Sequence, residues 1–368
     1  MSRVRQISGI VVIVLAVALT TFALVLRHES ACTAAPPLPA NAKPMKAIVQ
    51  RCYGPPQALA YEDIEKPTVA DDEVLIRVRA ASVNPLDWHV VRGIPYIMRM
   101  GAGFGAPDIS RVGVDFAGTV EAVGRNVTKF KPGDEVFGGK RGAFAEYVSV
   151  REDRPMVLKP ANATFEQAAA VPIAAITALQ ALRDQGHVQP GQKVLINGAS
   201  GGVGTFAVQI AKSMGAEVTG VCSTRNVDMV RSLGADHVID YTREDFTRGA
   251  EHYDVIVDNV GSHALRDYVH VLNPAGTFVI VGGPSEGRWI GAMSGPLKAY
   301  VLSPFVSQKL VFFIADMNPA DLAILSELMR SGKVTPVIDR TYKLSEVAAA
   351  IEYVEKGHAR GKVIVDVE

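Results

Sequence analysis

Short apolar runs alternate with helix-like segments through the second half of the chain. Between Lys193 and Gly283 these runs are "KVLI", "EVTGVC", "HVID", "DVIVDNV" and "TFVIVGG". Continuous apolar runs of about four to eight residues are typical of strands buried on both faces, and intervening helices allow such strands to pair in parallel. The pattern predicts an α/β fold with a doubly wound parallel sheet.

The first half follows a different pattern. From Met45 to about residue 160, runs such as "MKAIVQRCYG", "DEVLIRVRAASV" and "GTVEAVG" are separated by Gly, Pro and Asp, which predicts a compact β domain. A helical connector, "TFEQAAAVPIAAITALQALRDQG", follows, with Thr164 as its expected N-cap. The tail from Val334 has a β-α-β pattern and is expected to return to the first domain.

The N-terminal segment is uniformly apolar. Residues 7–26 form a run of 20 residues without a charge, and the Pro/Ala-rich stretch "TAAPPLPANAKP" follows. A helix of about 20 residues spans the roughly 30 Å core of a bilayer, and a secretory signal usually has a shorter apolar core of about 7–15 residues. The pattern therefore predicts one N-terminal transmembrane helix followed by a linker.

Overall composition narrows the class of protein. The 368 residues contain 38 Lys plus Arg and 38 Asp plus Glu, so no basic face for nucleic acid is indicated. Cys32, Cys52 and Cys222 are scattered without a C-x-x-C pair. Neither a disulfide framework nor a structural zinc lobe is predicted from that spacing.

A glycine-rich turn marks the candidate cofactor site. In "LINGASGGVGTFAVQIAK", Gly198, Gly201 and Gly204 lie between a predicted strand and a predicted helix. Glycines at this spacing permit a tight turn, close approach of a phosphate to the backbone, and close packing of helix on strand. The helix N-terminus favours an anion. The alternative is an ordinary glycine-rich turn. The predicted pyrophosphate contacts are Gly198, Ser200, Gly201, Gly202, Val203 and Gly204.

The next strand carries a signal for the type of cofactor. NAD is usually selected by an acidic residue about 20 positions beyond the glycines, whereas "EVTGVCSTRN" ends in Ser223, Thr224 and Arg225. An Arg and two hydroxyls suit a 2′-phosphate, which favours NADPH, unless the loop is simply solvated. Further predicted cofactor contacts at later strand ends are Tyr241, Asn259, Val260, Gly282 and Gly283; Tyr241 would serve equally as a packing residue.

These motifs together resemble the medium-chain dehydrogenase/reductase superfamily, in its quinone oxidoreductase (zeta-crystallin) branch. The similar region covers about residues 45–368 and includes the run from Gly191 through Gln209 and Lys212. The resemblance implies a GroES-like substrate domain, a Rossmann NADP-binding domain and a cleft between them. It gives expected bounds of 1–44 for anchor and linker, 45–165 for the substrate domain, 166–320 for the Rossmann domain and 321–368 for the C-terminal return. A homodimer is expected by analogy.

The zinc ligands of related alcohol dehydrogenases are replaced in this chain. The resemblance aligns Asn84, Val114 and Ile173 with the Cys, His and Cys that bind catalytic zinc in those enzymes. An amide and two aliphatic side chains cannot hold Zn²⁺, so no metal site is predicted.

Zinc-free chemistry favours a conjugated acceptor. Hydride added to a quinone or an α,β-unsaturated carbonyl gives a delocalised anion, which a few hydrogen-bond donors can stabilise. Asn84 is the expected donor, with a turn-capping amide as its alternative role. His89 occupies the proton-relay position of the alcohol dehydrogenases, although a histidine here is often structural. Thr177 aligns with a family threonine near the nicotinamide. The remaining substrate-site candidates, which would otherwise pack the core, are Asp87, Trp88, Arg92 and Tyr96.

The sequence thus predicts an NADPH-dependent, zinc-free oxidoreductase that transfers hydride to a quinone or an α,β-unsaturated carbonyl. The alternatives are a zinc-independent NAD(P)-dependent alcohol dehydrogenase and a non-catalytic NADPH-binding protein. Charges on both sides of residues 7–26 are nearly balanced, but a reductase needs cytoplasmic NADPH, so the catalytic region is expected in the cytoplasm. A lipid-soluble substrate would explain an anchor. Residues 284–316 are apolar and irregular, and their role is left open.

Overall fold

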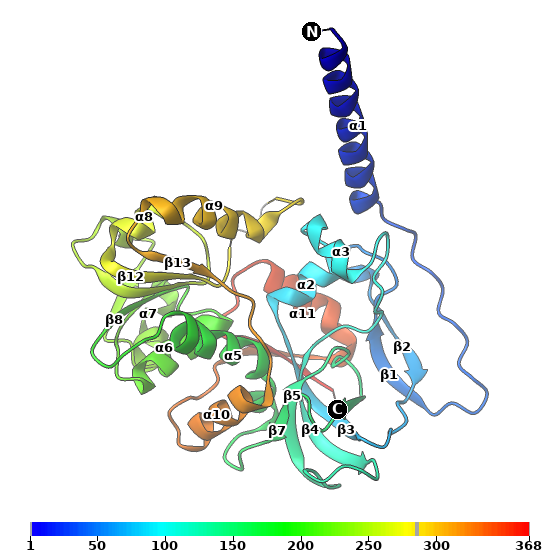
Figure 1. The fold of residues 1–368 in the computed structure, drawn as a ribbon. Helices are drawn as coiled ribbons and strands as arrows, with labels where there is room; N and C mark the ends of the chain where they lie inside the picture. Colours follow the sequence, from blue (N-terminus) through cyan, green and yellow to red (C-terminus); the bar gives the residue numbers. More distant parts are fainter. Residues whose placement is uncertain (1, 284–286, 368) are drawn as a thin grey trace.

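The structure, a computed structural model, describes residues 2–283 and 287–367, and its main body contains two sheet-based parts (Figure 1). One part is a six-stranded sheet covered by helices, and the other is built around a seven-stranded sheet. The connection between the parts is made by a helical segment that begins at Thr164, whose hydroxyl accepts from the backbone N–H of Gln167 as the expected N-cap. The predicted combination of a GroES-like β domain and a Rossmann domain is confirmed.

The Rossmann sheet is parallel throughout. Its strand order is β10-β9-β8-β11-β12-β13, so the order reverses at β8. The strands are β8 (Lys193–Asn197), β9 (Glu217–Cys222), β10 (His237–Asp240), β11 (Tyr253–Asp258), β12 (Leu272–Ile280) and β13 (Lys309–Phe312). A reversal of this kind opens a crevice at the carboxyl ends of the strands, which is where doubly wound sheets bind ligands. The five apolar runs noted in the sequence form the first five of these strands.

Helices pack against this sheet and link it to the other part of the molecule. They are α4 (Phe165–Ala169), α5 (Pro172–Gln180), α6 (Gly202–Ser213), α7 (Val227–Ser232), α8 (Leu265–His270), α9 (Ser294–Leu302) and α10 (Pro319–Arg330). The expected helical connector is interrupted, because Pro172 begins a new helix after the short first one. Within 284–316, where the sequence pattern is irregular, the structure contains α9 and the edge strand β13.

The substrate domain is a largely antiparallel sheet in the order β14-β15-β3-β4-β5-β7, with β6 paired to β3. Its strands are β3 (Glu73–Val83), β4 (Asp115–Val123), β5 (Glu135–Gly139), β6 (Tyr147–Arg151), β7 (Met156–Leu158), β14 (Ile338–Lys343) and β15 (Lys362–Asp366). A separate antiparallel pair is formed by β1 (Pro44–Val49) and β2 (Ala60–Glu65). Helices α2 (Pro85–Arg92), α3 (Arg99–Ala102) and α11 (Val347–Glu355) complete this part. The C-terminal strand β15 thus pairs with β3, which is distant from it in sequence, and β14 pairs with the other edge of β15.

The N-terminal helix α1 (Ser2–Arg27) extends away from the body of the protein (Figure 1). Its C-terminal end is fastened to the body: Leu26 is buried, and the Arg99 guanidinium donates to the carbonyl oxygens of Leu26 at 3.1 Å and His28 at 3.0 Å. In the part of the chain that the structure describes, no helix has the length and apolarity required to cross a membrane. The expected transmembrane anchor over 7–26 is therefore not supported, whereas the cytoplasmic placement, which was argued from the need for NADPH, stays a prediction.

A disulfide joins the segment after α1 to the substrate domain. Cys32 and Cys52 are bonded, with their Cα atoms 4.7 Å apart. The sequence did not predict this disulfide, because the spacing of the cysteines carries no recognisable pattern and the path of the N-terminal segment is what brings the two together. Cys222 is a buried thiol at the end of β9.

Candidate active site

The glycine loop, residues 198–204, connects β8 to α6 at the reversal of strand order. Gly198 has φ +77°, a left-handed conformation that favours glycine, and a Cβ at Gly204 would lie 2.1 Å from the carbonyl oxygen of Gly198. Around Gly201, by contrast, a Cβ would meet only that same oxygen, at 3.4 Å. The outer glycines are thus required for the turn, while the central one leaves its backbone accessible. This is the arrangement expected of a pyrophosphate cradle.

The C-terminal return strand completes the surroundings of this loop. The backbone N–H of Gly361 donates to the Ser200 carbonyl oxygen at 2.8 Å. A Cβ on Gly202 would lie 3.3 Å from Cδ of Lys362, so the lysine stem passes over the start of α6. The start of the substrate domain's last strand therefore lies directly against the glycine loop. The sequence could not reveal this contact, because it joins segments about 160 positions apart.

Two buried amide oxygens at this crevice fit a ligand. Oδ1 of Asn226 and Oδ1 of Asn259 are buried and accept no hydrogen bond from the residues that the structure describes. Their amide nitrogens are engaged: Asn226 donates to the Ser200 hydroxyl at 3.0 Å, and Asn259 donates to the Asn197 carbonyl oxygen at 2.9 Å. Buried polar atoms without a partner are costly, so these two oxygens are suited to accept from a bound molecule. The residues present fit a dinucleotide, which Gly201, Asn226 and Asn259 would contact.

The turn after β11 is shaped by a residue that sequence reasoning missed. Asp258 is buried and accepts from the Asn197 amide at 2.8 Å and from the backbone N–H groups of Val260 and Gly261. Those bonds hold the predicted contacts Asn259 and Val260 next to Gly198, where a Cβ would lie 2.7 Å from Val260 Cγ2. Gly282 packs on the same turn, because a Cβ there would meet the Asn259 carbonyl oxygen at 2.2 Å.

The residues expected to select the cofactor lie at the end of β9. The Arg225 guanidinium donates to the His358 carbonyl oxygen at 2.8 Å and so lies against the loop before β15. The Thr224 hydroxyl donates to Asp240 at 2.6 Å, and Ser223 accepts from Asn226 at 3.2 Å. Asp240, at the end of β10, is a neighbouring carboxylate that the sequence argument overlooked; hydrogen bonds, foremost from Thr224, lower its pKa. Tyr241 follows it and is exposed.

A cluster of buried polar residues lies where β3, β4 and β15 meet. The polar cluster consists of Ser82, Asn84, Asp87, Asp115 and Lys362, each no more than 3% exposed. The Asn84 side chain donates to Asp115 at 2.8 Å and accepts from the Lys362 ammonium at 2.6 Å. Asp115 also accepts from the Ser82 hydroxyl at 2.9 Å and from the backbone N–H of Ile173 at 3.1 Å. The Lys362 ammonium also forms an ion pair with Asp115 at 3.7 Å, so one buried cation is shared between an amide and a carboxylate.

Burial governs the protonation of this cluster. It raises the pKa of Asp87 to about 7, and the hydrogen bond from the Asn84 backbone N–H, at 2.7 Å, only partly offsets that effect. Burial likewise raises the pKa of Asp115 and lowers the pKa of Lys362. Neutral and charged forms of these groups are therefore closer in free energy than they would be in water.

An apolar cavity of about 350 Å³ lies next to this cluster, between the two parts of the molecule. Leu86 and Val114 contribute from the substrate domain, and Thr177 is the sole lining residue with a polar side chain. The cavity is lined by Leu86, Val114, Ile173, Ile176, Thr177, Val281, Phe312, Phe313, Ile314, Ala315 and Met317. Val281 follows β12 and Phe312 ends β13, so the cavity opens at the carboxyl ends of the Rossmann strands, on the same edge as the glycine loop.

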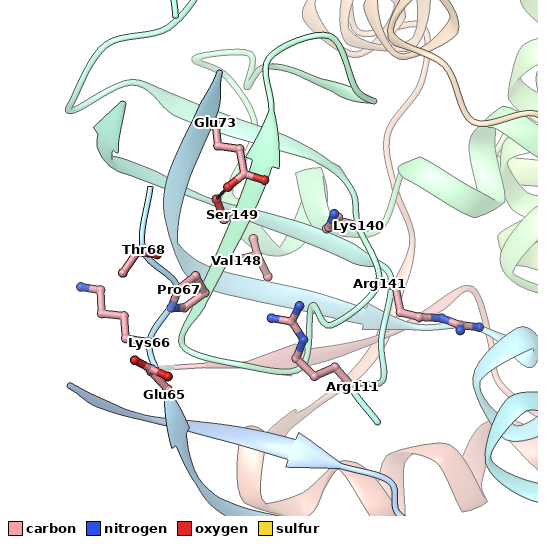
Figure 2. A pocket seen from close by; sticks show the side chains of 10 residues that line it. All are labelled: Glu65, Lys66, Pro67, Thr68, Glu73, Arg111, Lys140, Arg141, Val148 and Ser149. Atoms are coloured by element: carbon pink, nitrogen blue, oxygen red, sulfur yellow. Dashed lines mark hydrogen bonds between the residues drawn. The ribbon is translucent and has the colours of Figure 1, made fainter. Parts of the chain in front are cut away.

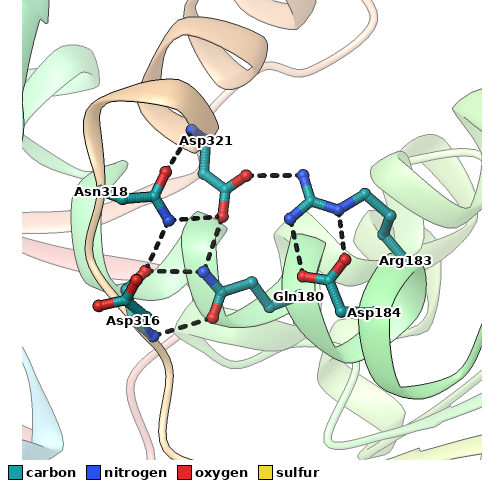
Figure 3. A network of polar contacts seen from close by, with 6 residues as sticks. All are labelled: Gln180, Arg183, Asp184, Asp316, Asn318 and Asp321. Atoms are coloured by element: carbon teal, nitrogen blue, oxygen red, sulfur yellow. Dashed lines mark hydrogen bonds and ion pairs between the residues drawn. The ribbon is translucent and has the colours of Figure 1, made fainter.

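One wall of the apolar cavity is held by a polar network between α5 and α10 (Figure 3). The Gln180 side chain donates to the Asp316 carbonyl oxygen at 2.7 Å and accepts from the Asp316 backbone N–H at 2.9 Å. Gln180 also donates to Asp321 at 2.7 Å, and Asp321 is bonded to Arg183 and Asn318. These bonds hold residues 313–317 at a defined distance from α5, which supplies the opposite wall.

Several predicted substrate-site residues do not line this cavity. Trp88 is buried in the core of the substrate domain and stacks on His89 with ring centroids 3.5 Å apart. His89 Nδ1 is 2.7 Å from the Ile94 carbonyl oxygen, and burial lowers its pKa. Arg92 forms a two-pronged ion pair with Glu355. Tyr96 is also buried, with its ring edge-on to Trp289 at 5.2 Å.

The three residues that replace the zinc ligands of the alcohol dehydrogenases lie in different surroundings. Val114 and Ile173 line the apolar cavity, whereas Asn84 belongs to the polar cluster behind it. Within residues 2–283 and 287–367, no three His, Cys, Asp or Glu side chains are grouped so that they could hold a metal ion. That the enzyme works without zinc remains a prediction from the residue types.

Comparison with known proteins agrees with this architecture. Residues 70–161 match the family model of the alcohol dehydrogenase GroES-like domain, and residues 233–365 match that of the zinc-binding dehydrogenase. The mitochondrial NAD(P)H oxidoreductase RTN4IP1 of Mus musculus is 37% identical over 336 residues, covering 80% of this chain and 82% of that protein. The chain belongs to the medium-chain dehydrogenase/reductase superfamily. Within this superfamily it falls in the quinone oxidoreductase branch and is an NAD(P)H-dependent oxidoreductase.

Two other members of the superfamily carry more specific names. The trans-enoyl reductase pgmF of Aspergillus terreus is 34% identical over 325 residues, covering 81% of this chain and 87% of that protein. A solved structure of the quinone oxidoreductase from Coxiella burnetii has a TM-score of 0.76 at 33% identity, covering 89% of this chain and all of that one. The chain therefore resembles reductases of both kinds over most of its length.

Proposed function

We propose that this protein is an NADPH-dependent reductase that transfers hydride to a quinone or to an α,β-unsaturated carbonyl, without zinc. The observation that carries the proposal is the position of the apolar cavity, which lies at the same edge of the Rossmann sheet as the glycine loop. Val114 and Ile173, which stand at two of the expected zinc-ligand positions, line this cavity. Those side chains have no atom that could coordinate a metal, and they suit a flat, apolar acceptor.

When bound along the glycine loop, NADPH would supply a hydride from its nicotinamide ring. For an enone, hydride adds to the β-carbon, and a proton from solvent adds to the α-carbon, which gives the saturated carbonyl. For a quinone, the hydride and one proton give the hydroquinone. Both reactions consume one NADPH and one proton, and both spread the developing negative charge over a conjugated system.

The polar cluster is the proposed source of stabilisation for that charge. One amide hydrogen of Asn84 is held by Asp115 at 2.8 Å, but the bond to the Ser82 carbonyl oxygen is 3.5 Å long, beyond the range of a strong hydrogen bond. This second hydrogen remains available for an acceptor oxygen. Lys362 and Asp115 would orient the amide, and the positive charge of Lys362 would strengthen it as a donor.

Preference for NADPH over NADH is proposed from Arg225. Its guanidinium lies at the end of β9, and among the described residues it bonds only the His358 carbonyl oxygen, which leaves further N–H groups for a 2′-phosphate. The nearby carboxylate of Asp240 is engaged by Thr224, by Thr242 and by Arg243 at 3.4 Å, which reduces its repulsion of a phosphate.

Steady-state NADPH oxidation with matched acceptors tests the proposal. A benzoquinone, a trans-2-enal and the saturated aldehyde of the same length should be compared, each before and after treatment with a strong chelator. We expect turnover of the quinone or the enal, little turnover of the saturated aldehyde, and no effect of the chelator. Preferential reduction of the saturated aldehyde would favour an alcohol dehydrogenase, and loss of activity that Zn²⁺ restores would contradict the zinc-free mechanism.

A further inference from the structure

A second cavity, of about 390 Å³, lies in the substrate domain outside the candidate active site (Figure 2). We call it the basic cavity, because four of its ten lining residues are Lys or Arg and two are Glu. Its lining residues are Glu65, Lys66, Pro67, Thr68, Glu73, Arg111, Lys140, Arg141, Val148 and Ser149. None of them lines the apolar cavity.

Three of the four cations that line the basic cavity have no partner side chain among the residues that the structure describes. Lys66 forms an ion pair with Glu121 and lies over the Tyr147 ring at 3.6 Å. Arg111, Lys140 and Arg141 form no ion pair or side-chain hydrogen bond with the residues that the structure describes. On the opposite side, Glu73 accepts from the Ser149 hydroxyl at 2.7 Å and so is already engaged.

Two cations face the cavity near the loop after β5, which carries Lys140 and packs against Arg111. Figure 2 shows the Arg111 head group extended into the cavity, with Lys140 across from it, whereas Arg141 is turned away. Gly142 has φ +101°, and a Cβ there would lie 3.2 Å from Cβ and 3.4 Å from Nε of Arg111. The arginine stem therefore rests against the loop backbone, which limits the ordering of Arg111 that binding would require.

We propose that the basic cavity binds a small multivalent oxyanion, of the phosphate or the polycarboxylate kind, between Arg111 and Lys140. The planar fork of an arginine matches the oxygens of a phosphate or a carboxylate, and a lysine adds a compact charge. The hydroxyl of Thr68, on the cavity wall, offers a further donor. The volume exceeds what a single small ion needs, so the ligand carries more than one oxyanion group or an attached body.

The loop that carries Lys140 also forms part of the active-site wall. The backbone N–H of Lys140 donates to the Val114 carbonyl oxygen at 2.9 Å, and Gly139 packs directly on the Met317 side chain. Val114 and Met317 both line the apolar cavity. An anion in the basic cavity would therefore restrain a segment in contact with the substrate side of the protein, and its effect would be on KM for the acceptor.

Calorimetric titration of the full chain tests this site independently of catalysis. The protein should be saturated with NADPH, which occupies the phosphate site at the glycine loop, and titrated separately with pyrophosphate and with citrate. The test variant is the double substitution Arg111→Gln and Lys140→Gln. The control is Arg125→Gln, since Arg125 is an exposed cation paired with Asp71 outside the cavity. Circular dichroism and thermal unfolding should verify that both variants are folded.

We expect one equivalent of at least one probe to bind, with Kd raised tenfold or more in the double variant and unchanged in Arg125→Gln. Pyrophosphate binding alone would identify a phosphate ligand, and citrate binding alone a polycarboxylate. Absence of binding of both probes at millimolar concentration would overturn the proposal, and so would equal Kd values in the folded double variant and the native chain. The titration measures anion binding and does not depend on catalysis. If no anion binds, the proposed reductase activity can still be observed as NADPH oxidation, so failure of one proposal is distinguishable from failure of the other.

Discussion

The Lys362 ammonium donates to the side-chain oxygen of Asn84 at 2.6 Å, across 278 positions of sequence. This bond determines how the amide is oriented, because Oδ1 faces the lysine and Nδ2 faces Asp115 at 2.8 Å. It also joins the last strand of the chain to the first turn of α2. The C-terminal return is thus part of the candidate site as well as of the substrate domain's sheet.

Replacement of Lys362 by Met should destabilise the protein markedly. The substitution keeps the stem that packs over Gly202 but leaves Asp115, which is fully buried, without its cation. Removal of one partner from a buried pair costs about 3–5 kcal/mol in free energy of unfolding, which urea denaturation would measure. Lys309→Met is the control, because Lys309 is an exposed residue at the start of β13. Equal losses in the two variants would contradict the importance of the buried contact.

Replacement of Asp87 by Asn should change how stability depends on pH. Folding raises the pKa of Asp87 from 3.8 to about 7, so between these values the folded chain keeps a proton that the unfolded chain releases. Raising the pH over that window therefore favours unfolding, by at most about 1.4 kcal/mol per pH unit, and the effect levels off above pH 7.

The Asn side chain has a similar shape and does not titrate in this range. The free energy of unfolding of Asp87→Asn, minus that of the native chain, should therefore increase from pH 4 to pH 7. Paired denaturation series at several pH values would measure this difference. A difference that stays constant with pH would show that Asp87 is not the buried, proton-holding group inferred from its surroundings.

Replacement of Asn84 by Ala should lower kcat by roughly 10²-fold if the amide donates to the developing oxyanion. The Kd for NADPH, measured by fluorescence titration, should change little, because Asn84 lies on the side of Lys362 away from the glycine loop. A kcat within twofold of the native value in a folded variant would reduce Asn84 to a turn residue.

Replacement of Arg225 by Glu should shift cofactor preference from NADPH toward NADH. A carboxylate at the end of β9 repels a 2′-phosphate and accepts from a ribose hydroxyl. The ratio of kcat/KM for the two cofactors measures the shift. Arg231→Glu is a matched control, because Arg231 is an exposed residue on the following helix. An unchanged ratio, or a native enzyme that already prefers NADH, would refute the proposed phosphate contact.

The sequence was most informative where local pattern and tertiary structure agree. The five apolar runs became β8 to β12, because strands buried on both faces must be apolar throughout. Gly198 was assigned to the tight turn and Gly204 to close packing of the helix, and both roles depend on backbone geometry that few other residues tolerate. Strand β13 was missed because its four residues have no distinctive period and lie in a long irregular segment.

The candidate site was less predictable, because its central contacts are long-range. Lys362 lies in an apolar strand near the C-terminus, and no local signal shows that its ammonium reaches Asn84. His89 was proposed because it aligns with the proton-relay position of the alcohol dehydrogenases, and Arg92 because it belongs to the same short segment, but positions along one helix face different directions. Their side chains instead bond Ile94 and Glu355. The pairing of Cys32 with Cys52 likewise depends on the path of the N-terminal segment.

Transfer of a labelled hydride tests the central claim most directly. The protein should be incubated with NADPH carrying deuterium at the transferred position of the nicotinamide and with a trans-2-enal, and the product should be analysed by NMR and mass spectrometry. The account predicts a saturated aldehyde with one deuterium at the β-carbon and an intact carbonyl, because charge is delocalised in an apolar cavity without a metal. Deuterium at the carbonyl carbon of an allylic alcohol would contradict it.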